Sequence, residues 1–336
     1  MFSRLLAVMV TIGVILFAGW MTLRRDDISY DRLEKIYANS DSRYLALGEE
    51  MRIHFRDVGP RDAPAIVLVH GFSASLHTWE PWVADLRRDH RVISLDLPGH
   101  GLSRCIDNDE IGMAQFVDVI ERLTSALKVE RFTLIGNSMG GAAAWNYALA
   151  HPGQLDALVL VDASGWPQTG EDGKGRPFIF RLLEIPLARY AIKDLDLSSL
   201  IRSGLEDSFA DPSFVTSEMV DRYASLARAP CHREALLSLS AGRDRRSPAT
   251  AERLSGIAAP TLVMHGAEDN LIPASHGELF AAAIPGAELK LYPDVGHLPQ
   301  EEIAAQSVAD LRAFLHARVL GLEAAPVMAG EPDVPS

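Results

Sequence analysis

The chain has 336 residues, of which 48% are apolar and 23% charged, with a formal net charge of −13. This length suits one large domain with an insertion, and the composition excludes a largely disordered chain. The negative charge, unbroken by any Lys/Arg stripe, argues against a nucleic-acid partner and favours a neutral or cationic substrate. Only Cys105 and Cys231 occur, and their spacing indicates neither a disulfide framework nor a zinc site.

The N-terminal segment is uncharged from Leu5 to Leu23. At about 1.5 Å of rise per residue, a helix of this length crosses the hydrocarbon core of a bilayer. We therefore predict that residues 1–23 form a transmembrane anchor; a cleaved signal segment and a buried helix are the alternatives. The flanking arginines are nearly balanced, and we expect the body on the periplasmic or exported side. Residues 24–41 are expected to form a linker or a short surface helix.

Short apolar runs alternate with helical patterns after residue 42, which predicts an α/β fold with a doubly wound, mostly parallel sheet. In such sheets ligands bind at the carboxyl ends of the strands. The predicted strands are 42–47, 51–57, 65–69, 91–95, 132–135, 157–161, 261–264 and 288–292, and the predicted helices are 114–127, 139–150, 275–283 and 303–315.

One stretch interrupts this alternation. Residues 165–250 are helical in pattern, mixed in charge and contain several prolines, which indicates an inserted helical cap. The α/β core would then comprise residues 42–164 and 251–322. Residues 323–336 lack apolar periodicity and are expected to be a disordered tail.

Ser138 lies in Gly136-Asn137-Ser138-Met139-Gly140, between a predicted strand and a predicted helix. This is the GxSxG pattern in the strand–turn–helix setting of a nucleophile elbow. The small neighbours allow the serine to adopt a strained backbone conformation without a collision with adjacent strands. The amino terminus of the following helix stabilises a developing oxyanion. The sequence therefore predicts Ser138 as a nucleophile, with a glycine-rich turn of no chemical role as the alternative.

A serine hydroxyl needs a base to take its proton, and histidine has a suitable pKa. His297 follows the last predicted strand and precedes the final helix, so we predict it to be the base. His265, at a strand end before a turn, and His151, before a proline at a helix end, are expected to be structural.

The base needs an acid that fixes its tautomer, and Asp269 follows the strand at 261–264. Glu268, its neighbour, and Asp162, at the end of an earlier strand, remain alternatives. The backbone N–H groups of Met139 and Phe72 are the predicted oxyanion hole, since one donor follows the nucleophile and the other lies in the loop after residues 65–69.

Five motifs together resemble the α/β-hydrolase superfamily over residues 42–320. They are HGF at 70–72, DLPGHGLS at 96–103, GNSMGG at 136–141, GAEDNLIP at 266–273 and GHLPQEE at 296–302. The resemblance implies a catalytic triad of Ser138, Asp269 and His297, no cofactor, and a cap over the pocket. It also implies that Asp96 belongs to a structural turn.

Serine at the elbow differs from the haloalkane dehalogenase and epoxide hydrolase branches, which place an aspartate there. GNSMGG is similar to the C–C bond hydrolases of meta-cleavage products, but those often carry an aromatic residue where this chain has Leu298. We therefore expect a serine esterase, carboxylesterase- or lipase-like, that acts on a lipophilic small-molecule acyl substrate without a metal or other cofactor. A C–C bond hydrolase and a non-catalytic binding protein are the alternatives. The oligomeric state is left open.

Overall fold

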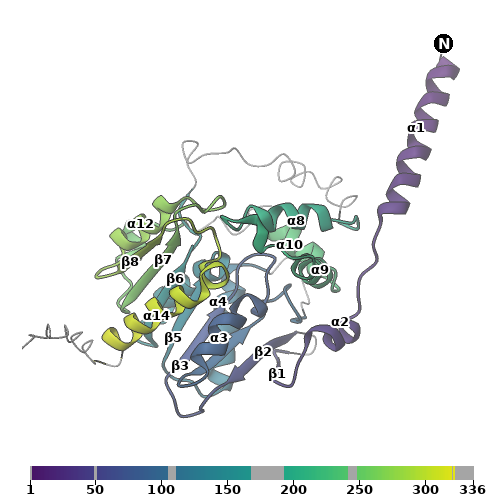
Figure 1. Cartoon of the computed structure of the whole chain (residues 1–336). Coiled ribbons are helices and arrows are strands. Elements are labelled where there is room, and N and C mark those ends of the chain that lie inside the picture. The colour runs from purple at the N-terminus through teal and green to yellow at the C-terminus, as the bar shows by residue number, and fades with distance from the viewer. Residues whose placement is uncertain are drawn as a thin grey trace, which may run out of the picture.

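The computed structural model describes residues 2–48, 51–104, 111–167, 193–240, 248–319 and 321. Figure 1 shows a central sheet with helices on both faces, further helices above one edge of the sheet, and a first helix that projects from the body. The tail expected at 323–336, and the parts of the expected cap at 168–192 and 241–247, lie outside the described residues.

Eight strands form one sheet in the order β1-β2-β4-β3-β5-β6-β7-β8. β2 pairs antiparallel with both β1 and β4, and all the other pairs are parallel. The expectation of a mostly parallel sheet is confirmed. The strands are β1 (Ser42–Ala46), β2 (Arg52–Val58), β3 (Ala65–Val69), β4 (Arg91–Leu95), β5 (Phe132–Asn137), β6 (Leu155–Val161), β7 (Thr261–Gly266) and β8 (Glu288–Tyr292).

Each face of the sheet has its own apolar core, because successive side chains of a strand point to opposite faces. In β3, Val67 and Val69 join one core, while Ile66 and Leu68 join the other. The first core is completed by α4 (Met113–Ala126), α5 (Met139–Ala150), α11 (Ala251–Leu254) and α12 (Ala274–Ala283), and the second by η1 (Leu76–Trp79), α3 (Glu80–Leu86) and α14 (Ala304–Arg318). A strand buried on both faces is continuously apolar, which explains why β3 has no polar residue.

Between β6 and β7 the described residues contain α8 (Ser198–Glu206), η2 (Pro212–Phe214), α9 (Ser217–Leu226) and α10 (His232–Ser240). We call residues 193–240 the helical insertion. In Figure 1 its helices lie together above the sheet. Cys231, directly before α10, is in a disulfide, which the spacing of the cysteines did not indicate; the other cysteine of the sequence, Cys105, lies outside the described residues.

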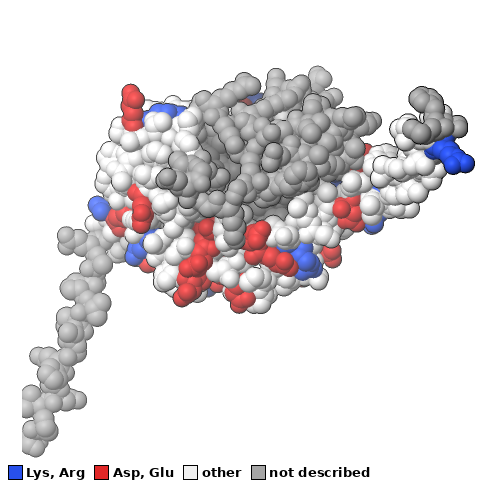
Figure 2. Space-filling model, turned by 90° about the horizontal axis from the view of Figure 1, so that it is seen from above, with Lys and Arg blue, Asp and Glu red and all other residues white. Residues whose placement is uncertain are grey.

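The first helix, α1 (Phe2–Leu23), projects from the body. Its residues Arg4–Leu23 are long and apolar enough to cross a membrane, and none of the apolar window is buried; a signal sequence would meet the same criteria. Figure 2 shows this helix almost free of charged residues except at its outer end, whereas acidic and basic residues are scattered over the body.

The residues after α1 are attached to the helical insertion. Arg25 N donates to Asp194 O (2.7 Å), and Asp196 N donates to Leu23 O (2.9 Å). The next element is α2 (Tyr30–Tyr37), a short helix with Leu33 buried. Residues 24–41, expected to form a linker or a short surface helix, therefore contain a short helix, and hydrogen bonds hold the residues before it.

Candidate active site

Ser138 occupies a sharp turn between β5 and α5. Its φ of 54° and ψ of −117° lie in a region that L-residues rarely adopt. The flanking glycines make this turn possible: a Cβ on Gly136 would lie 2.1 Å from Gly140 O, and one on Gly140 would lie 2.2 Å from Val69 O. The backbone thus has the geometry of the nucleophile elbow that the sequence predicts for Ser138.

His297 lies in the loop between β8 and α13 (Pro299–Glu302), and Asp269 lies in the loop after β7. His297 Nδ1 is 2.6 Å from Asp269 Oδ2, and the side chains are 5% and 0% exposed. Burial raises the pKa of Asp269, but the charge and hydrogen bond of His297 more than offset this, so the pKa of this carboxyl lies below its usual value. The acid is thus ionised and directed at the ring of the base.

The loops of Ser138 and His297 meet through Asn137, which precedes the serine. Asn137 Nδ2 donates to His297 O (3.1 Å) and to Val161 O (3.2 Å). Ser138 itself donates its backbone N–H to Val161 O (3.0 Å). Serine and histidine therefore lie at the same edge of the sheet, although no hydrogen bond joins Ser138 Oγ to the His297 ring in this structure.

The two predicted oxyanion donors lie on either side of Ser138. Met139 is the first residue of α5, and Phe72 follows Gly71, whose Cβ would lie 3.0 Å from Ser138 Cβ if it were an alanine. Neither Phe72 N nor Met139 N donates to another described residue. Both N–H groups are thus available to a bound oxygen.

The helical insertion contacts the loop of the base directly. His297 N donates to Ser208 O (2.8 Å) in the stretch between α8 and η2. Glu302 joins the same parts: its Oε2 accepts from Gly296 N (2.8 Å), and its Oε1 accepts from Ala210 N (3.1 Å). Sequence reasoning missed Glu302, since nothing in the pattern separates it from a solvated carboxylate.

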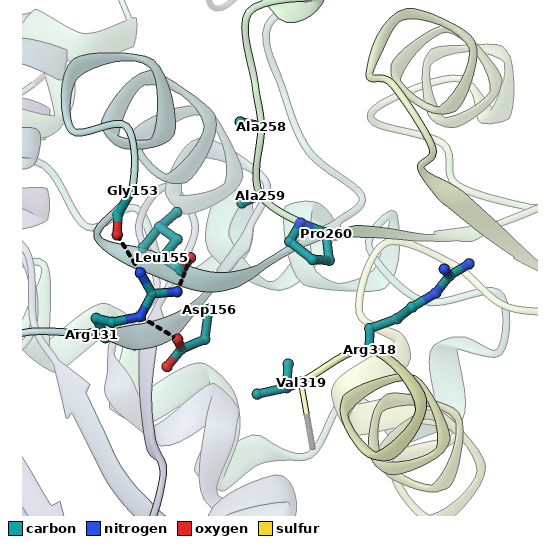
Figure 3. Close-up of a pocket in the computed structure, with 9 residues that line it drawn as sticks. All are labelled: Arg131, Gly153, Leu155, Asp156, Ala258, Ala259, Pro260, Arg318 and Val319. Carbon is teal, nitrogen blue, oxygen red and sulfur yellow. Dashed lines mark hydrogen bonds and ion pairs between the residues drawn. The ribbon is translucent and has the colours of Figure 1, made fainter. Parts of the chain in front are cut away.

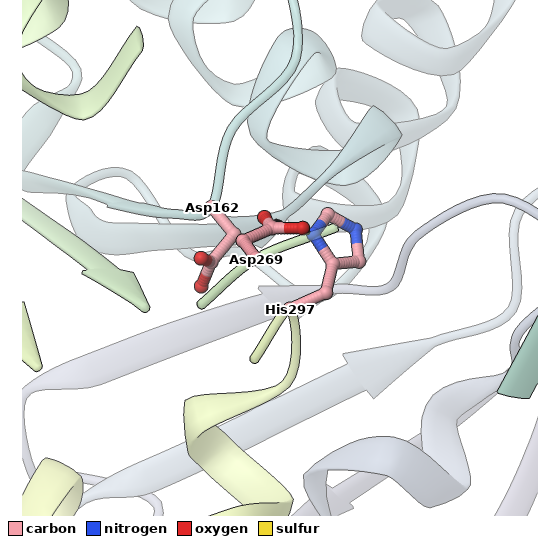
Figure 4. A group of neighbouring side chains, drawn as sticks. All are labelled: Asp162, Asp269 and His297. Atoms are coloured by element: carbon pink, nitrogen blue, oxygen red, sulfur yellow. Dashed lines mark hydrogen bonds and ion pairs between the residues drawn. The ribbon is translucent and has the colours of Figure 1, made fainter. Parts of the chain in front are cut away.

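Asp162, one of the alternatives for the acid, lies beside the pair but does not contact the base as Asp269 does. The polar atoms of Asp162, Asp269 and His297 lie within 4.8 Å of one another, and Figure 4 shows the Asp269 carboxyl group next to the His297 ring. Such spacing is also found around bound cations. Here a cation between Asp269 and His297 would have to displace their 2.6 Å hydrogen bond.

The other residues weighed from the sequence have structural partners. His265 is completely buried in β7, with Nε2 3.1 Å from Ile272 O. His151 ends α5, where its ring stacks on Tyr147. Asp96, directly after β4, accepts from Leu76 N at the start of η1 and from Leu102 N. Glu268 is exposed.

A surface pocket lies at the opposite edge of the sheet, where β5 and β6 begin (Figure 3). Its Arg131 is already bound to the Asp156 carboxylate (2.7 Å) and to the carbonyls of Gly153 (2.6 Å) and Leu155 (3.3 Å). The pocket therefore presents no unpaired charge from Arg131 and lies away from Ser138.

Comparison with known proteins agrees with the fold. A family model described as alpha/beta hydrolase fold matches residues 64–303. A 2-hydroxy-6-oxononadienedioate/2-hydroxy-6-oxononatrienedioate hydrolase of Comamonas testosteroni is 28% identical over 284 residues, 81% of this chain and 95% of the relative. The crystal structure of a hydrolase from Pseudomonas aeruginosa PA01 is 28% identical, with a TM-score of 0.67 over 82% of this chain and 98% of that one. An esterase from a Rhodococcus species shares the fold at 24% identity, with a TM-score of 0.67 over 83% and 99% of the two chains.

Proposed function

The chain belongs to the α/β-hydrolase family, and on that basis we propose that it is a serine hydrolase that cleaves a carboxylic ester with Ser138, His297 and Asp269. The observation that carries this proposal is the buried 2.6 Å hydrogen bond between His297 and Asp269, at the edge of the sheet where Ser138 occupies its strained turn. A base oriented by a carboxylate beside a serine at an elbow is the arrangement that acyl transfer requires.

In the proposed mechanism, His297 Nε2 takes the proton of Ser138 Oγ as the oxygen attacks the ester carbonyl. The amides of Phe72 and Met139 donate to the resulting oxyanion, and Asp269 stabilises the imidazolium. His297 then protonates the leaving alcohol, and water, deprotonated by the same ring, releases the acid from Ser138. The missing Ser138–His297 hydrogen bond forms when substrate binds, as catalytic hydrogen bonds often tighten only in the complex.

Replacement of Ser138 tests this mechanism. We expect Ser138→Ala to lower kcat for p-nitrophenyl esters by on the order of 10⁶, because the serine and its base act as a unit. The matched control is Ser125→Ala, at an exposed position of α4, which should leave kcat unchanged. A Ser138→Ala protein that keeps most of its esterase activity would refute the assignment.

A second candidate is hydrolysis of a C–C bond, supported by the relative from Comamonas testosteroni. Leu298 directly after the base favours ester cleavage, because the similar C–C hydrolases often carry an aromatic residue there. Parallel kcat/KM measurements on p-nitrophenyl esters of graded chain length and on a 2-hydroxy-6-oxo-dienoate separate the two. A non-catalytic binding protein, the third possibility, predicts that a serine-directed phosphonate leaves Ser138 unlabelled.

We further propose that α1 anchors the enzyme in a membrane, with the body on the periplasmic or exported side. Support comes from the exposed apolar length of the helix. A lipophilic acyl substrate would concentrate in the bilayer beside such an enzyme, which favours this substrate class.

A further inference from the structure

Asp162 is a second carboxyl group at the proposed triad, and the mechanism above gives it no role. It directly follows β6, and its side chain is completely buried. Its backbone N–H donates to Met264 O (2.9 Å), and its Oδ1 accepts from Gly266 N (2.9 Å). Both partners belong to β7, the strand that leads into the loop of Asp269. Asp162 is therefore held firmly beside the acid of the triad.

Too little positive charge surrounds these carboxyl groups for both to be ionised. Two carboxylates that share a buried site cannot both carry a charge without compensation. The nearby His265 has Nε2 3.6 Å from both carboxyl groups, but burial lowers its pKa and keeps it neutral. Glu302 from α13 adds negative charge, and Tyr292 from β8 stays neutral because burial raises its pKa. Among the described groups around this pair, positive charge then comes only from the imidazolium that His297 becomes in the proposed mechanism, and it serves a single carboxylate.

The hydrogen bonds decide which carboxyl group holds the proton. Asp269 accepts three: from His297 Nδ1 (2.6 Å), Leu271 N (2.7 Å) and Ile272 N (3.0 Å). Asp162 accepts one through Oδ1, and its buried Oδ2 has no partner among the described residues. Donors stabilise the ionised form, so the charge belongs on Asp269. Consistently, burial and then the charge of Asp269 raise the pKa of Asp162 well above its ordinary value.

Given the triad of the proposed function, we propose that Asp162 is a positioning residue whose protonated carboxyl group donates a hydrogen bond to Asp269 and keeps that carboxylate directed at His297. The proton stays on Asp162 throughout the reaction. Asp162 acts as a neutral hydrogen-bond donor that holds the Asp269 carboxylate in place. Because it carries no charge, it does not compete with Asp269 for the His297 imidazolium.

Two substitutions at Asp162 separate a neutral donor from a carboxylate. Asp162→Asn keeps an acceptor for Gly266 N and supplies a permanent N–H donor to Asp269, so we expect kcat for p-nitrophenyl esters within about 3-fold of wild type at pH 7. Asp162→Ala removes the donor and should lower kcat by about 10- to 100-fold with little change in KM. Thermal unfolding of each full-length variant checks that it is folded.

The proposal is overturned if Asp162→Asn loses as much activity as Asp162→Ala, or if the Ala variant is as active as wild type. An independent readout is the infrared difference spectrum between wild type and Asp162→Asn at pH 7. We expect the carbonyl band of a protonated carboxylic acid in the wild type only, and its absence contradicts the proposal. This band does not depend on activity, so it separates failure of the inference from failure of the proposed function, which Ser138→Ala tests.

Discussion

Glu301 illustrates how neighbouring residues of one short helix, α13, differ in their surroundings. Its Oε1 accepts a hydrogen bond from Thr78 Oγ1 (2.5 Å). Burial raises the pKa of Glu301 to about 7, against the lowering effect of the Thr78 hydrogen bond. Because the folded state binds this proton more tightly than the unfolded chain, the stability from Glu301 is complete below about pH 4.5 and is lost as the pH rises through 7.

We therefore expect Glu301→Gln to be more stable than wild type at pH 8, by at most about 3 kcal/mol, and equally stable at pH 4. Partial exposure of the residue to solvent reduces the gain. Urea unfolding of both proteins between pH 4 and pH 8 measures the difference. A gap that is the same at every pH would show that Glu301 does not titrate in this range.

At this scale the sequence located Ser138, His297 and Asp269, because each follows a strand at the carboxyl edge of a parallel sheet. In the structure His297 and Asp269 are in contact, and Ser138 lies at the same edge of the sheet. The positioning role proposed for Asp162 and the contacts of Glu302 were not predictable, since both depend on partners far away in the chain: Gly266 is 104 residues from Asp162, and Ala210 is 92 residues from Glu302.

Among the elements, the loop of the base and the helical insertion form one unit. His297 N binds Ser208 O, and Glu302 joins Gly296 to Ala210 and Asp211. The buried strands of the sheet, such as β3, were predictable from unbroken apolar runs. The individual helices α8, α9 and α10 were not, because the insertion is mixed in charge and its packing partners lie in other elements.

Glu302→Gln tests this unit. The amide keeps one acceptor and turns the other end into a donor that faces a backbone N–H, so a partly buried hydrogen bond to a charged acceptor is lost. We expect kcat for the preferred ester to fall roughly 10-fold and stability to fall by about 2 kcal/mol. Glu301→Gln, one residue away, is the matched control and should leave kcat unchanged at pH 7. If both variants are as active as wild type, the contact between insertion and loop does not position His297.

For the whole molecule, α1 differs from the longer helices of the body in its burial. Its apolar window is 0% buried, whereas the helices of the body with seven or more residues each contribute to an apolar cluster. The sequence predicted this helix from its lack of charge alone. Neither length nor composition separates an anchor from a signal segment.

Val14→Arg tests the proposed anchor, because an arginine at the centre of a membrane helix costs about 2.5–3.5 kcal/mol. Wild type and the matched variant Val14→Leu should stay with the membrane fraction after alkaline extraction, whereas Val14→Arg should be largely released. The N-terminal sequence of the purified protein provides a second test. A mature chain that begins after residue 19 would identify a cleaved signal segment and contradict the proposed anchor.

The paired backbone at the foot of α1 has a mechanical consequence. Arg24 and Leu195 form an antiparallel bridge, and Arg233 donates to Arg25 O (2.7 Å) from within the insertion. The residues that connect α1 to the body are therefore held by hydrogen bonds and do not form a free linker at this point. The same helical insertion thus binds the backbone at the foot of α1, through Asp194 and Asp196, and the backbone of His297, through Ser208.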